Sequence, residues 1–152
     1  MSSRKVSANP EANLHVKQLH MLKLLNIHLN HFPKHEKYGL SQQIRNAAYD
    51  IYNITTECQK RYHKKTSLVN LDIRHEQLRM LIKLAFELGY YEYKDSRNNL
   101  GEKEARRRYQ EALMLLETVN GYLSSELELT LSKCSAIGYF QSKHNKGINH
   151  AL

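Results

Sequence analysis

The densest group of basic side chains lies near the middle of the sequence and surrounds a single tyrosine. Its members are Lys60, Arg61, His63, Lys64 and Lys65, with Tyr62 among them. Several cations within one short segment can neutralise neighbouring phosphates of a nucleic-acid backbone. The group therefore predicts contact with a polyanion, and the alternative is an ordinary solvated charged surface.

Two further sets of cations carry less weight, because carboxylates stand beside them. The run Arg106 to Arg108 advances by about 100° per residue on a helix, so its three side chains cannot share one ligand. Arg74, Arg79 and Lys83 lie in an apolar stretch. Nearby acidic residues, most of them three or four positions away, offer intrahelical ion pairs. They are Asp72, Glu76, Glu87, Glu102, Glu104 and Glu111. We expect one or two arginines of the run 106–108 to be paired. For Arg74, Arg79 and Lys83 we expect pairing to absorb much of the charge, unless an oligomer interface or channel uses it.

Histidines supply the one spacing that suggests a metal site. They are His20, His28, His31 and His35. Pro33 interrupts the helical geometry inside this set, and no cysteine or carboxylate pair completes it. We therefore expect exposed histidines and no metal.

His75 lies at helical spacing between Leu71 and Leu78, so we expect it to point inward and to bond a polar neighbour.

Catalytic signatures are missing. The sequence contains no GxSxG, Walker-type GxxxxGK[ST], HExxH or GxGxxG motif. We predict no catalysis, cofactor or small-molecule substrate, although an enzyme that attacks nucleic acid through histidine and lysine stays a third hypothesis. The ten tyrosines could stack on bases, but Tyr49 and Tyr109 are expected to pack at helix contacts.

Composition sets the class of partner. The 152 residues suit one domain, and 23 lysines and arginines against 15 acidic residues give a net charge of +8. This balance favours nucleic acid over an anionic membrane or an acidic protein.

Cys58 and Cys134 are isolated, so we expect neither zinc nor disulfides, and a cytoplasmic location. No apolar run approaches the roughly 18 residues of a membrane span.

Four helical segments must position these side chains. Apolar residues recur every three to four positions. The expected helices cover about 11–30, 41–62, 66–88 and 102 onward, the last with a possible extension to Leu131. Ser41 is the expected N-cap of the second helix, and Gly89 the expected C′ residue of the third. The fold predicted is an all-α antiparallel four-helix bundle.

The remaining segments complete the expected organisation. We expect a polar arm over 1–10, the bundle over 11–131 and a basic, flexible tail over 132–152. Tyr90 to Gly101 reads as a polar loop. Residues expected to face inward from the fourth helix are Ala105, Tyr109, Ala112, Leu113, Leu116 and Val119.

Two stretches carry a family resemblance. Residues 32–45 read Phe-Pro-Lys-His-Glu-Lys-Tyr-Gly-Leu-Ser-Gln-Gln-Ile-Arg, and Leu68 to Gly89 contains Leu-Arg-Met-Leu-Ile-Lys-Leu-Ala. Over about Leu14 to Leu127 the chain resembles the accessory variability determinant proteins of diversity-generating retroelements. It is also similar to the four-helix-bundle proteins encoded in ribosomal-RNA intervening sequences. The family usually has a tryptophan near the end of the fourth helix, and Glu117 to Glu126 has none.

The resemblance implies an accessory protein with no activity of its own. It implies a basic homo-oligomer, a homopentamer, that binds a reverse transcriptase and its template RNA or cDNA and assists mutagenic retrohoming. The residues carried over as phosphate or acidic-partner contacts are Arg45, Lys60, Arg61, Lys64, Lys65, Arg74, Arg79 and Lys83. Two alternatives stay open: a scaffold that docks an acidic protein through its basic surface, and an intervening-sequence bundle protein with another role.

Overall fold

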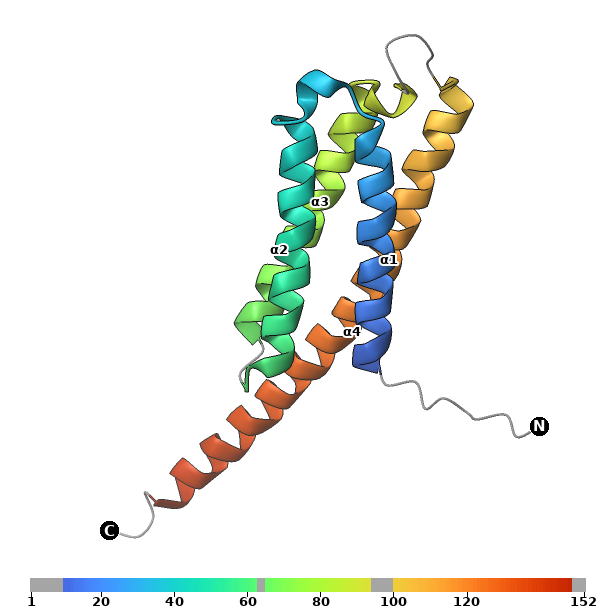
Figure 1. The fold of residues 1–152 in the computed structure, drawn as a ribbon. Helices are drawn as coiled ribbons and strands as arrows, with labels where there is room; N and C mark the ends of the chain where they lie inside the picture. Colours follow the sequence, from blue (N-terminus) through green and yellow to red (C-terminus); the bar gives the residue numbers. More distant parts are fainter. Residues whose placement is uncertain (1–9, 63–64, 94–99, 149–152) are drawn as a thin grey trace, which may run out of the picture.

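The structure, a computed structural model, describes residues 10–62, 65–93 and 100–148, with side chains described for 14–62, 65–93, 100–125 and 132. Within these residues the chain forms four α-helices and two short 3-10 helices (Figure 1). The elements are α1 (Pro10–Asn30), η1 (Lys34–Glu36), α2 (Leu40–Lys60), α3 (Lys65–Glu87), η2 (Tyr90–Glu92) and α4 (Glu102–Ile148).

Successive helices run in opposite directions and pack around one core (Figure 1). α1 packs against α2 and α4, and α3 packs against the same two helices, so α1 and α3 occupy opposite corners of the bundle. This arrangement confirms the expected all-α antiparallel four-helix bundle.

The core is built from the apolar stripes that define the helices. Its largest fully buried apolar side chains are Met21, Ile44, Ile51, Leu71, Leu78, Ile82 and Val119. Each large aliphatic side chain contributes about 1.5–3 kcal/mol by leaving water. The predicted inward residues of the fourth helix are all buried or half-buried, which confirms its orientation.

The turn between α1 and α2 is held by one carboxylate. Glu36 Oε2 accepts a hydrogen bond from the Leu40 backbone N–H at 2.8 Å, and Glu36 Oε1 accepts one from the Tyr90 hydroxyl at 2.7 Å. Both bonds lower the pKa of Glu36. The prediction of Ser41 as N-cap is wrong, because Ser41 is already helical and buried and Glu36 satisfies the first free N–H instead.

Gly39 makes this cap possible, because a side chain at position 39 would overlap the Glu36 carboxylate. We expect Gly39→Ala to displace the cap and to lower the free energy of unfolding by about 1 kcal/mol. Gly121→Ala is the control: nothing lies within 4 Å of its added Cβ, and it should stabilise α4 by about 0.5–1 kcal/mol. Urea denaturation measures both. Equal effects of the two substitutions would contradict the close-approach explanation.

An aromatic cluster closes the same end of the bundle. Gly89 has φ 76° and ends α3 as predicted, and the following turn buries Tyr91. The Tyr91 ring lies edge-on to Phe32 at 5.1 Å, and Tyr109 stacks on Phe86 at 4.3 Å. The expected polar loop after Gly89 therefore begins with a packed segment, and its residues 94–99 lie outside the described structure.

α4 is longer than the sequence indicated. It contains 47 residues, and its C-terminal half extends past the ends of the other helices (Figure 1). The segment over 132–152 was expected to be a basic, flexible tail, and its backbone is helical as far as Ile148. Facing the bundle, α4 presents Ala105 and Ala112 near the aromatic end and Leu116, Val119 and Leu123 beyond them.

Candidate nucleic-acid interface

The predicted central cluster lies at the end of the bundle where α2 meets α3. Lys60 is the last residue of α2 and Lys65 the first of α3. Arg61 forms an ion pair with Glu57 one turn earlier, whereas no described ion pair involves Lys60 or Lys65. Lys64 and His63 lie outside the described residues. The two lysines are thus exposed cations that can meet an external anion.

Arg45, in the second turn of α2, and Arg74, in the middle of α3, both bind amides. Arg45 Nη2 donates to Asn30 Oδ1 at 3.0 Å, across the contact between α2 and α1. Arg74 Nη1 donates to Gln77 Oε1 at 3.1 Å on α3. Because amides are neutral, both guanidinium groups keep their full charge, and the expected ion pair of Arg74 is not formed.

Arg79 and Lys83 lie one turn apart on α3, on its side toward α4. Arg79 binds Glu76 through two hydrogen bonds of 2.9 and 2.5 Å, which lower the pKa of Glu76. This pair confirms the predicted intrahelical neutralisation of Arg79. Lys83 is exposed and takes part in no described ion pair.

All three arginines of the run on α4 are paired, where the sequence predicted pairing of one or two. Arg106 contacts Glu102 at 3.4 Å, Arg107 contacts Glu104 at 2.7 Å, and Arg108 contacts Glu104 at 3.5 Å. The bonds from Arg107 hold the pKa of Glu104 at about 2. The longest basic run in α4 therefore contributes little net charge.

Sequence reasoning missed the cations around α1. Lys17 and Lys23 lie on α1, and Lys34 and Lys37 lie in the turn after it. The segment 14–30 contains no acidic residue, and Glu36 in the turn is held by Leu40 and Tyr90. The absence of acidic residues from 14–30 is the sequence signal that could have identified the basic surface around α1.

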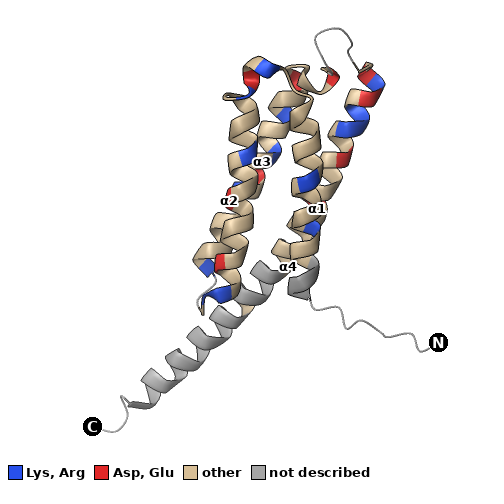
Figure 2. Ribbon diagram, in the orientation of Figure 1, with Lys and Arg blue, Asp and Glu red and all other residues tan. Residues whose placement is uncertain are grey.

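The seven predicted residues that the structure describes do not form one site. They fall at the α2–α3 end, near the start of α2, in the middle of α3 and on the α4 side of α3, and the described basic residues are spread over all four helices (Figure 2). Such a distribution creates an extended positive field and no single pocket. A flexible polyanion is the ligand class that an extended field attracts.

Two histidines depart from the predictions. His28 was expected on the solvent face but is buried. His75 is buried as expected, and it departs from the prediction only in its hydrogen bonding. Burial, helped for His28 by Arg108, lowers the pKa of each to about 4. Neither ring nitrogen of His75 has a hydrogen-bond partner, so its expected polar contact is not formed. No group of three potential metal ligands occurs in the described part of the chain.

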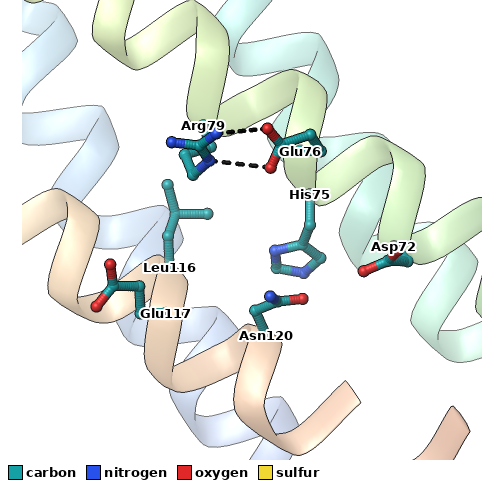
Figure 3. Close-up of a pocket in the computed structure, with 7 residues that line it drawn as sticks. All are labelled: Asp72, His75, Glu76, Arg79, Leu116, Glu117 and Asn120. Carbon is teal, nitrogen blue, oxygen red and sulfur yellow. Dashed lines mark hydrogen bonds and ion pairs between the residues drawn. The ribbon is translucent and has the colours of Figure 1, made fainter. Parts of the chain in front are cut away.

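A small cavity borders His75 between α3 and α4 (Figure 3). Its volume of about 50 Å³ suits one or two water molecules and excludes a nucleotide. Asp72 and Asn120 lie beside the imidazole, and the Arg79–Glu76 pair lies at the other end (Figure 3). Its lining residues include no serine, threonine or cysteine that could act as a nucleophile.

In the described helices, no segment has the length and apolar character needed to cross a membrane.

No curated protein matches the chain. A family model described as bAvd-like matches residues 14–104, which include most of α1, all of α2 and α3, and the first three residues of α4. The chain therefore belongs to the bAvd-like family of accessory variability determinant proteins.

Proposed function

We propose that this protein is a basic, oligomeric accessory factor that binds nucleic acid and assists a reverse transcriptase with its template RNA or cDNA in mutagenic retrohoming. The observation that carries the proposal is the spread of unpaired cations over a bundle of this family. It acts by binding and positioning its partners, not by catalysis. Exposed apolar side chains on α1 and α3 support self-association, and the family resemblance implies a homopentamer.

A salt series tests the nucleic-acid contact. Wild-type protein should bind single-stranded RNA and DNA with an affinity that falls steeply as salt rises, because phosphate contacts release counterions. Changing Lys60, Lys64 and Lys65 together to glutamine should weaken binding by about 10-fold or more and flatten the dependence on salt. Fluorescence anisotropy at four salt concentrations measures both quantities.

The matched control removes the same charge from the paired run. Changing Arg106, Arg107 and Arg108 to glutamine should alter affinity by less than about 3-fold, because those cations are already neutralised by carboxylates of α4. Equal losses in the two variants would show that only net charge matters. Absence of binding at low salt would overturn the proposal and favour an acidic protein partner for the basic surface.

A further inference from the structure

The outer face of α3 is apolar where a solvated helix should be polar. Val69, Ile73, Met80, Leu84 and Leu88 recur along it at helical spacing, and each is between 42% and 52% exposed. The opposite face of the same helix is buried in the core through Leu71, Leu78 and Ile82. The stripe is interrupted by one polar turn, at Glu76 and Gln77. Exposed apolar side chains gathered along one helix face in this way mark a protein contact.

Part of the stripe forms one wall of a groove between α2 and α3. The groove has a volume of about 720 Å³. Met80, Leu81 and Leu84 line it from α3 together with the polar Arg74, Glu76 and Gln77. Ala47 lines it from α2 together with the polar Gln43, Asn46 and Asp50. Asp50 stands at its edge and takes part in no described ion pair. The small side chain of Ala47 keeps the groove open, so it can receive the side chains of another helix.

A complementary surface lies on α1, at the opposite corner of the bundle. Val16, Leu19 and Ile27 are exposed on its outer side. Lys23 lies among them and forms no described ion pair. α1 therefore carries exposed apolar side chains in addition to its buried apolar stripe, and its only exposed charged residue within 14–30 is a lysine.

We infer that the outer face of α1 of one copy lies in the α2–α3 groove of a second copy, with Lys23 against Asp50. This inference rests on the proposed function, which includes self-association of the chain. What it adds is the identity of the two surfaces that make the contact. Val16 to Ile27 spans about 16 Å and Arg74 to Leu84 about 15 Å, so the two surfaces match in length.

The positions of the two surfaces dictate the kind of assembly. The outer face of α1 and the groove are separate surfaces, and α1 lies opposite α3, which forms one wall of the groove. We therefore expect a different neighbour at each surface. Each copy therefore joins two neighbours through a head-to-tail contact. Such contacts close into a ring or grow into a filament, and they exclude a two-fold symmetric dimer.

Reciprocal variants test this contact. Ile27→Glu damages the α1 surface and leaves the groove intact, whereas Leu84→Glu damages the groove and leaves α1 intact. In light scattering after size exclusion, each variant alone should fall from the oligomer to the 17.8 kDa chain. An equimolar mixture should form a dimer of twice that mass, because one intact α1 meets one intact groove. Met114→Glu, exposed on α4, should leave the oligomer unchanged.

The charge pair provides a second test that does not depend on apolar surfaces. Lys23→Asp and Asp50→Lys should each weaken self-association by about 10-fold, and the double variant should recover most of that loss. Circular dichroism of every variant checks that the bundle folds.

Three results would overturn the inference: a monomeric wild type at 100 μM (roughly a hundredfold above a micromolar Kd), a mixture of the Glu variants that stays monomeric, or a double charge variant without recovery. No nucleic acid is present in these measurements. A failure here therefore leaves the salt-series result intact, and failure of nucleic-acid binding leaves the contact between copies testable.

Discussion

Acidification from pH 6.5 to pH 5 should lower the free energy of unfolding by about 2 kcal/mol through His75 alone. The imidazole is buried and its pKa in the folded chain is about 4, against 6.5 when it is free. Below pH 6.5 the unfolded chain therefore binds a proton that the folded chain does not accept. The contribution of His75 to stability is complete above pH 6.5 and is lost progressively as the pH falls toward 4. His28, whose pKa is lowered in the same way, adds to the loss.

The pH window separates the histidines from the carboxylates. Glu36, Glu76 and Glu104 have lowered pKa values, so the stability they contribute is kept above about pH 4.5 and is lost only below it. Between pH 6.5 and 5 the histidines dominate. Asp72 and Glu117 face the cavity beside His75, but burial is the cause that lowers its pKa.

His75→Leu provides the control for this prediction. The variant replaces two buried ring nitrogens that have no hydrogen-bond partner within the described protein by an apolar side chain, so it should be more stable than wild type by about 1 kcal/mol near neutral pH. Its free energy of unfolding should also change less between pH 6.5 and 5. Urea denaturation at pH 7.5, 6.5, 5.5 and 5.0 measures both effects. An unchanged pH dependence in the variant would contradict the assignment to His75.

Ile82→Ala should destabilise the folded chain by about 2–5 kcal/mol. Ile82 is fully buried on α3, the helix that packs against both α2 and α4. Truncation removes three carbons from the core, and the loss includes the cavity left behind as well as the lost transfer free energy. A domain of this size is stable by only about 5–15 kcal/mol, so the change should move the urea midpoint strongly.

Met114→Ala is the matched control, because Met114 on α4 is 68% exposed. We expect a change within about 0.5 kcal/mol for this substitution. Comparable losses for Ile82→Ala and Met114→Ala would mean that the packing around α3 differs from the one described.

The parts of the fold that were predictable depend on local chemistry. Apolar spacing located the four helices, and Gly89 marked the end of α3, because both signals act within a few residues. The cap of α2 was missed because Glu36 reaches forward from the preceding turn and also binds Tyr90, 54 positions away in the chain. The helical backbone after Lys133 was missed because its polar composition resembles a tail.

The candidate interface was less predictable than the fold. Pairing of Arg79 and Arg106 to Arg108 followed from the three- and four-residue spacing of nearby carboxylates. The positions of basic residues in the sequence do not show which face of the bundle each side chain occupies. Arg74 and Lys83 were therefore grouped, although they lie on different sides of α3. His75 was correctly placed inside, but its missing partners depend on α4, which sequence spacing cannot position.

Along the inward face of α4 the side chains change from Ala105 and Ala112 to the larger Leu116, Val119 and Leu123. This change in size fixes the position of α4 along the axis of the bundle. Sliding the helix by seven residues toward the aromatic end would bring Val119 to the place of Ala112, where there is room for only a methyl group. Sliding it the other way would leave voids where Val119 now fills the core. The projecting half of α4 therefore starts at the same level in every molecule, so copies that assemble side by side would present these arms at one common height.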